Sequence, residues 1–171
     1  GAVRDWWLMC SIEPALIMVG TADGQQVVGI GTESGICTAL PQDVTEVELR
    51  IPNKDGNLPG REVKRARFPL CWIANDESLV TVAELSVEST SKHSQLRVKV
   101  CIEREGKLTL ESAMLNGRGS ERYLTDMRKV RPEERGMCAL GPVFDMSARC
   151  LGYAVRHSEH EAAVVLDLRI E

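Results

Sequence analysis

The residues of this sequence best suited to covalent chemistry are one cysteine and three histidines. Cys138 lies in the segment Gly136-Met137-Cys138-Ala139-Leu140-Gly141-Pro142, which is bounded by glycines. A thiolate is a strong nucleophile, but acyl transfer also needs a base that removes the proton from the thiol. The three imidazoles that could supply this base are His93, His157 and His160. Cys138 is therefore a nucleophile only if the fold brings a histidine to it.

Two further groups of polar residues have a conceivable chemical use. The stretch 157–161 reads His-Ser-Glu-His-Glu and contains metal-ligand types, but in a hairpin turn such a cluster is more often a solvated tip. We therefore predict no metal site and no cofactor. A basic stretch consists of Arg61, Lys64, Arg65 and Arg67. It would suit an acidic partner or a phosphate, although Glu62 interrupts it and an exposed strand face is the favoured interpretation.

The elements that must position these residues are strands. Residues 45–51 and 95–103 alternate strictly between polar and apolar types, which predicts half-buried antiparallel strands. Similar short runs occur at 15–20, 26–31, 35–39, 68–74, 79–87, 107–113, 142–144, 150–155 and 162–170. Turn signals such as Asp23-Gly24 and Asn116-Gly117 separate them. We expect an all-β chain, with helical turns only at 132–135 and within 120–130.

The polar stretch 88–94 has no apolar residue and divides the chain almost in half. We predict a first β unit over residues 1–88, a linker over 89–95 and a second β unit over 96–171, with about six strands in each unit. The pair Trp6-Trp7 near the start of the chain is expected to plug the end of a barrel or to meet a neighbouring domain.

Composition limits the function classes. The chain has 171 residues, 43% hydrophobic residues and a net charge of −4, so it can bury a sizeable core and has no overall positive field for a nucleic acid. No apolar run is long enough to span a membrane, and the start lacks the pattern of a signal peptide. Six cysteines are widely spaced, mostly within apolar runs, which favours buried free thiols and an intracellular location.

The segment from Gly136 to Asp145, followed by 148–155, resembles the nucleophile region of the trypsin-like serine proteases. That family writes this region as G-D/N-S-G-G-P-V/L-F/V-D/N-x-x-G-x-V/L-V/I-G. Alignment on Pro142 puts Ala139 in the position of the serine. Residues 123–137 resemble the stretch that precedes the serine in the HtrA/Deg branch of the family, and residues 161–170 resemble its closing strand.

The resemblance also covers the first half of the chain. Residues 28–44 resemble the strands that deliver the catalytic histidine and place Pro41 in its position. Residues 78–85 resemble the motif that carries the catalytic aspartate and place Ser78 there, directly after Asp76 and Glu77. The resemblance therefore implies two six-stranded antiparallel β-barrels of the trypsin-like protease type.

Acyl transfer in this family needs a hydroxyl, an imidazole and a carboxylate, and Pro41, Ser78 and Ala139 do not supply this set. Three replaced positions indicate a natural pseudoprotease more than a single engineered alanine. We accordingly expect a chain that is not an enzyme, has no catalytic residues and acts as an interaction, scaffolding or regulatory module. Its expected partner is a protein or an extended peptide, with no nucleic acid and no membrane.

The family resemblance adds homo-oligomers and adjoining PDZ domains as possibilities that the sequence does not show. Two alternatives remain open. The stretch around Cys138 is similar to the G-x-C-G-G pattern of viral chymotrypsin-like cysteine proteases, which makes a cysteine endopeptidase using Cys138 the main rival. A structural β domain unrelated to proteases would place Pro41, Ser78 and Ala139 far apart.

Overall fold

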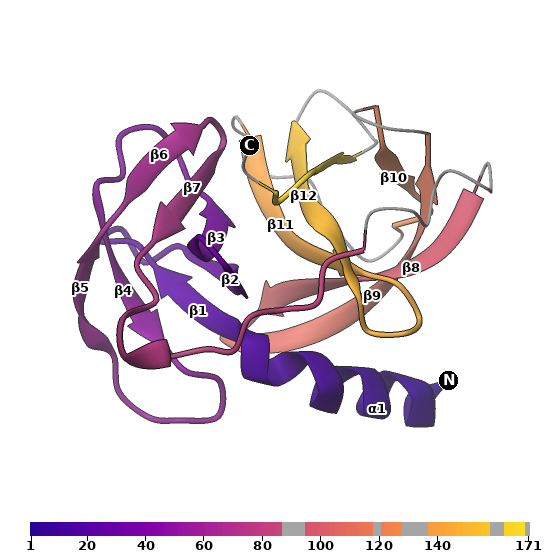
Figure 1. The fold of residues 1–171 in the computed structure, drawn as a ribbon, viewed down its shortest axis with the longest axis horizontal. Helices are drawn as coiled ribbons and strands as arrows, with labels where there is room; N and C mark the ends of the chain where they lie inside the picture. Colours follow the sequence, from indigo (N-terminus) through magenta and orange to yellow (C-terminus); the bar gives the residue numbers. More distant parts are fainter. Residues whose placement is uncertain (87–94, 118–120, 128–136, 158–162, 170–171) are drawn as a thin grey trace.

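Strands dominate the computed structural model of this chain, which describes residues 1–86, 95–117, 121–127, 137–157 and 163–169 (Figure 1). The elements of the first half are α1 (Ala2–Ile12), η1 (Glu13–Ala15), β1 (Leu16–Gly20), β2 (Gln26–Thr32), β3 (Gly35–Ala39), β4 (Glu46–Arg50), β5 (Leu58–Glu62), β6 (Lys64–Arg67), β7 (Leu70–Ile73) and η2 (Asp76–Ser78). Those of the second half are β8 (Gln95–Arg104), β9 (Lys107–Asn116), β10 (Tyr123–Thr125), β11 (Met137–Phe144), β12 (Cys150–His157) and β13 (Ala163–Leu166).

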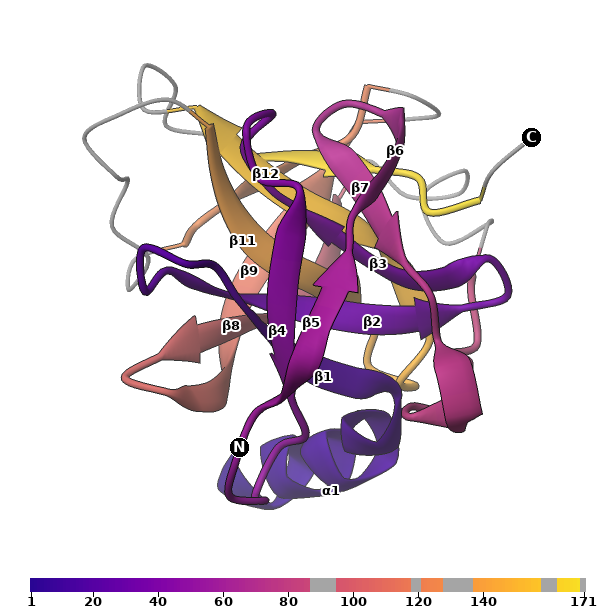
Figure 2. The ribbon, with the colours of Figure 1, turned by 90° about the vertical axis from the view of Figure 1, so that its left-hand side faces the viewer.

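The first barrel is nearly closed by one bent strand. Its sheet has the order β5-β4-β1-β2-β3-β7-β6, and only Val63 separates the two terminal strands in the sequence. β5 pairs with β4 and β6 pairs with β7, so the two halves of this strand complete the circuit around the barrel (Figure 2). At the bend the Val63 N–H donates to the Thr45 carbonyl at 2.9 Å. The sheet has seven strands instead of six because one strand is broken into β5 and β6.

The second barrel is closed, with the order β10-β13-β12-β11-β8-β9. Its longest ladder joins β8 and β9 from Gln95 and Asn116 to Arg104 and Lys107. The inward residues of this ladder, among them Val98, Val100 and Leu115, are buried. The predicted all-β fold of two six-stranded antiparallel barrels is confirmed.

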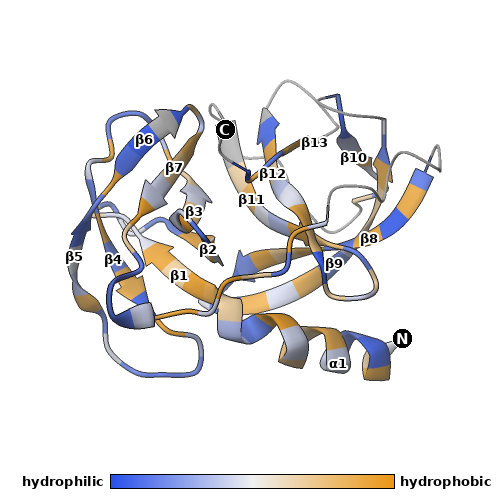
Figure 3. Ribbon diagram, viewed as in Figure 1, coloured by the Kyte–Doolittle hydropathy of each residue, from blue (hydrophilic) through white to orange (hydrophobic). Residues whose placement is uncertain are grey.

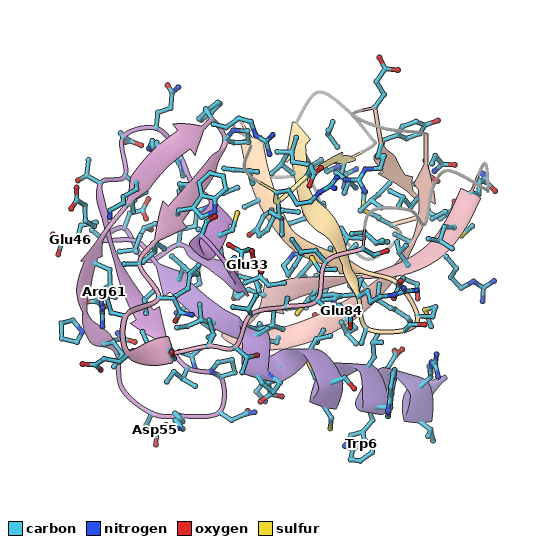
Figure 4. All side chains as sticks on the ribbon, viewed as in Figure 1. Trp6, Glu33, Glu46, Asp55, Arg61 and Glu84 are labelled. Atoms are coloured by element: carbon cyan, nitrogen blue, oxygen red, sulfur yellow. The ribbon has the colours of Figure 1, made fainter. Side chains whose placement is uncertain are left out.

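The N-terminal helix α1 was not expected. It buries Leu8 and Ile12 and is tied to the second barrel by an ion pair between Asp5 and Lys99, whose Nζ lies 3.0 Å from Asp5 Oδ1. Trp6 is 69% exposed and points away from both barrels (Figure 4). The prediction that the tryptophan pair plugs a barrel end is therefore wrong for Trp6.

Residues 79–86 cross from the first barrel to the second, and most of the strand predicted at 79–87 does not form. The N–H of Thr81 donates to Pro14 and that of Ala83 to Gly31, both at 2.9 Å. Further along, the segment exchanges two hydrogen bonds of 2.8 Å with Cys150. At Gly31 a Cβ would lie 2.2 Å from the Thr81 carbonyl oxygen, so the crossing requires a glycine there.

Two sequence predictions fall partly or wholly outside the described residues. The linker was predicted at 89–95. Residues 89–94 lie outside the described residues, and Gln95 belongs to β8. The division into units at 88 and 96 stays a prediction. The helical turn predicted at 132–135 is also outside the described residues, whereas the stretch 120–130 contains strand β10.

A buried hydrogen-bond cluster joins the two barrels. Tyr153 of β12 donates its hydroxyl proton to the Val28 carbonyl of β2 at 2.6 Å. Thr38 of β3 donates to the same carbonyl at 3.0 Å, and its oxygen lies 3.2 Å from the Tyr153 hydroxyl. Both side chains are fully buried. Since Tyr153 belongs to one barrel and Val28 and Thr38 to the other, this cluster fixes their relative position.

Apolar residues from both barrels form a common core around this cluster, which includes Leu16, Ile30, Trp72 and Phe144. Figure 3 shows the apolar character of β1 in this core.

The predicted buried thiols are confirmed at Cys37, Cys71, Cys101 and Cys150, whereas Cys10 is exposed.

Burial raises the pKa of the Cys71 thiol to about 11 and that of the Cys150 thiol to about 12. Burial also raises the pKa values of Cys37 and Cys101. These four thiols stay protonated at neutral pH and are poor nucleophiles.

Within the described ranges, no helix combines the length and the apolar character needed to cross a bilayer.

Replacing Tyr153 by Phe tests the cluster that joins the barrels. We expect Tyr153→Phe to lower the free energy of unfolding by about 1–2 kcal/mol, because it removes a buried donor and leaves the Thr38 and Val28 oxygens less well satisfied. Urea unfolding monitored by tryptophan fluorescence measures this. Tyr123→Phe is the matched control, since Tyr123 is 43% exposed. Equal stability of the two variants would contradict the assigned role.

Candidate functional site

The segment predicted to carry the nucleophile lies where the two barrels meet. Ala139 is in β11, which pairs with β12 and β8 of its own barrel and contacts β2 and β3 of the other. Its half-buried side chain packs against the common core and against the core of the first barrel. The fold therefore delivers Ala139 to the barrel junction, as a catalytic position in this architecture requires.

The two glycines of the motif are needed for close backbone approaches. Gly141 has a φ of 150°, and a Cβ there would lie 1.8 Å from the Cys101 carbonyl oxygen. Gly152 has a φ of 149°, and a Cβ there would lie 2.4 Å from the Leu166 carbonyl oxygen. Both residues lie within strands of the second barrel rather than in turns. Their presence follows from the packing of β11 and β12 against neighbouring strands.

The ladder between β11 and β12 continues to the start of β11. Ala139 pairs with Val155, Cys138 with Arg156 and Met137 with His157. The side chains of Cys138 and His157 are outside the described part of the structure, as are residues 93 and 160. The assignment of Cys138 as an alternative nucleophile therefore stays a prediction.

The loop after β3 carries Pro41 and is held by one arginine. Pro41 is exposed, and its carbonyl accepts the Val44 N–H at 3.2 Å to close the loop. Arg65 of β6 donates to the carbonyls of Leu40 at 3.1 Å and Val44 at 2.8 Å, and also to that of Pro41. A single side chain thus satisfies three carbonyls and fixes the position of Pro41 in the fold.

The register between β3 and β7 separates Ser78 from Pro41. These antiparallel strands pair Ala39 with Leu70 and Ile36 with Ile73. Pro41 follows the end of β3, whereas Ser78 lies five residues beyond Ile73, at the opposite end of the ladder. Ser78 is exposed and has a φ of 50°. The ladder does not bring Ser78 beside Pro41.

The residue that this ladder brings next to the Pro41 loop is Pro69. Its carbonyl accepts the Leu40 N–H at 3.4 Å, and it directly precedes β7. The sequence did contain a signal for this neighbour, because the strand predicted at 68–74 forms as β7 and pairs with β3, whereas residues 79–86 belong to the crossing segment. The neighbouring carboxylate Asp76 lies on the Ser78 side, where it pairs with Arg61 at 3.2 Å.

Pro41, Pro69 and Ala139 offer no hydroxyl, imidazole or carboxylate. A serine-protease triad therefore cannot be formed from these three positions. Among the described residues no group of three metal-ligating side chains occurs. The histidine and glutamate cluster at 157–161 falls on side chains outside the described set.

The turn after β11 is built by Asp145, which is buried and bonded locally. Its carboxylate accepts the N–H groups of Ser147 at 2.9 Å and Arg149 at 3.0 Å, and it forms an ion pair with Arg149 at 3.2 Å. Ala148 of this turn has a φ of 69°, in the left-handed region. Ala148 occupies the glycine position of the family motif, at a cost in backbone strain.

Comparison with known proteins places this fold. No protein-family model matches the chain, and no curated protein matches it either. Among solved structures, a human pathogenic astrovirus serine protease is 21% identical, with 91% of each chain covered and a TM-score of 0.61. Deg5 is 14% identical over 96% of this chain and 89% of its own, with a TM-score of 0.67. A serine endoprotease from Yersinia pestis is 14% identical over 93% and 60%, also with a TM-score of 0.67.

The chain thus has the fold of the trypsin-like serine proteases, which these neighbours share. The prediction that it is not an enzyme is corrected by the same matches, because the similar structures are described as proteases. At these identities they identify no catalytic residue in this chain.

Arg65 provides a test of how the Pro41 loop is held. We expect Arg65→Met to lower the free energy of unfolding by about 2 kcal/mol, since three carbonyls lose a charged donor while the aliphatic packing is kept. Chemical denaturation measures the change. Arg97→Met is the control, because Arg97 is exposed on β8. A loss no greater than that of the control would show that the clamp does not stabilise the loop.

Replacing Ala148 is expected to stabilise the protein, in contrast to replacing Arg65. We expect Ala148→Gly to raise the free energy of unfolding by about 0.5–1 kcal/mol, because glycine adopts a φ of 69° without strain. Thermal and urea unfolding both report this gain. Ser147→Gly in the same turn should not stabilise the protein, because Ser147 is not in the left-handed region. Destabilisation by Ala148→Gly would refute the strain argument.

Proposed function

We propose that this domain acts on polypeptides, and that it binds an extended segment at the barrel junction beside Ala139 and the Pro41 loop. The observation that carries the proposal is the contact of β11 in the second barrel with β3 in the first. It brings the two halves of the candidate site together from residues about a hundred positions apart in the sequence. The serine proteases with similar structures support the same class of ligand.

The surroundings of the junction suit a chain in extended conformation. The first sheet ends in β6, a terminal strand on the same hairpin as β7. Terminal strands offer backbone groups to an added strand, so affinity can come from main-chain hydrogen bonds and selectivity from side chains. The buried bonds of Tyr153 keep both walls of the junction fixed, which lowers the entropic cost of binding.

Hydrolysis at this site requires side chains other than those of Pro41, Pro69 and Ala139. An acyl-transfer nucleophile needs a deprotonated oxygen or sulfur and a base within reach. Cys138 is the adjacent residue with such an atom. Binding without cleavage defines an interaction or regulatory module, whereas binding followed by cleavage defines a peptidase.

Retention and digestion of a peptide pool measure both steps in one experiment. The full chain is immobilised and incubated with a proteome-derived peptide pool, and mass spectrometry then identifies retained peptides and new termini. Pro41→Trp places a bulky side chain on the loop beside the proposed site, and Pro59→Trp in β5 is the matched control, since both prolines are exposed. Cys138→Ala reports whether any cleavage uses the thiol.

We expect the wild-type chain and Pro59→Trp to retain the same set of peptides, and Pro41→Trp to lose at least about 90% of it, which corresponds to tenfold weaker binding. Thermal unfolding confirms that each variant is folded. Failure of the folded wild-type chain to retain or cleave any peptide would refute the proposed function. Equal retention by the two tryptophan variants would move the binding site away from the junction.

A further inference from the structure

We propose that the hairpin of β6 and β7 selects an acidic residue two positions from an apolar one in the bound polypeptide, through Lys64, Arg67 and Phe68. This inference rests on the proposed function and adds the class of sequence that the site prefers. It concerns the basic stretch in the first half of the chain, whose cations the structure divides into two kinds.

The side chains of two of the four cations form several or charged contacts within the protein. Arg61 pairs with Asp76 at 3.2 Å, and Arg65 donates to the carbonyls of the Pro41 loop. Lys64 and Arg67 are exposed, and within the described ranges neither forms an ion pair with a carboxylate, while Arg67 donates to one main-chain carbonyl. Their charges therefore remain available to a ligand, on a strand that Figure 3 shows as predominantly hydrophilic.

The positive charge of Arg67 lies at the barrel junction. Its guanidinium donates to the main-chain carbonyl of Asp167, so β6 is linked directly to the segment that follows β13 in the other barrel. Burial raises the pKa of the Cys37 thiol in the common core, and the nearby charge of Arg67 acts in the opposite direction. Because Arg65 of the same hairpin holds the Pro41 loop, the hairpin borders the proposed binding site on the side of this loop.

An apolar contact lies next to these cations. Phe68 is 49% exposed at the turn of the hairpin, directly after Arg67. In an extended ligand consecutive side chains point to opposite faces, and residues two apart share one face. A carboxylate that reaches Lys64 or Arg67 thus leaves an apolar side chain two positions away free to cover Phe68. This arrangement favours Asp or Glu two positions from an apolar residue.

Charge complementarity argues for the acidic ligand. The chain carries a net charge of −4, so unpaired cations at this junction are a local exception and not part of a general basic surface. An exposed ion pair stabilises a complex by a small factor, and we expect a two- to fivefold preference for acidic over neutral sequences, on the order of that measured for surface pairs. The preference should decrease as the salt concentration rises.

Retention of the proteome-derived peptide pool on the immobilised chain tests this preference directly. The frequency of Asp and Glu in retained peptides is compared with that in the input pool for three proteins. These are the wild-type chain, Lys64→Glu/Arg67→Gln, and the control Arg97→Gln/Lys107→Glu. The control makes the same charge change at exposed positions of β8 and β9. The single variant Lys64→Glu is included because the Lys64 side chain forms no ion pair or hydrogen bond within the described chain that its replacement would break.

We expect a two- to fivefold acidic enrichment, about the factor of a surface ion pair, for the wild type and the control, and its loss in the hairpin variants while neutral peptides are still retained. Unchanged enrichment in the folded hairpin variants would overturn the inference, as would retention by the wild type without any enrichment. In both cases peptide binding itself survives. If the wild type retains no peptide, the proposed function fails and the hairpin inference falls with it.

Discussion

The position of the candidate site depends on the hydrogen bond that Tyr153 donates across the barrel junction. Its acceptor, the Val28 carbonyl, also receives the Thr38 hydroxyl, so one buried oxygen joins strands of both barrels. Thr38 lies three residues before Pro41, and Tyr153 lies two residues before Val155, which pairs with Ala139. The same interaction therefore sets both walls of the site. A shift between the barrels would change the site before it changed either barrel.

The sequence was sufficient to predict the strands and the barrels but not the contacts between them. Strict alternation at 95–103 marks β8 because a half-buried strand needs a period of two. Tyr153 and Thr38 are 115 residues apart, and no local pattern reports such a contact. The alternation within 79–86 belongs to a segment that crosses between the barrels, so it does not mark a strand that pairs beside the Pro41 loop. Helix α1 was missed because its stability comes from packing of Leu8 and Ile12, not from a strong capping signal.

The trypsin-like protease fold of this chain keeps the backbone features of the motif around Ala139. Gly141 and Gly152 are still required for backbone packing, so the part of the motif that shapes the junction is present. Pro41, Pro69 and Ala139 cannot move protons or attack a carbonyl. What the described residues provide is a rigid junction, an anchored loop and a hairpin with two exposed cations that form no ion pair. We propose that these features serve recognition of a polypeptide, which is the step that precedes cleavage in any peptidase.

Hydrogen–deuterium exchange of the full chain, with and without a peptide that it retains, tests the central claim most directly. The account predicts slower exchange on peptide binding in three places: the loop at 40–44, the hairpin of β6 and β7, and the first residues of β11. Protection of these segments from both barrels at once would locate the polypeptide at the junction. Protection confined to α1 around Trp6, or to strands β4 and β5, would contradict binding at the junction.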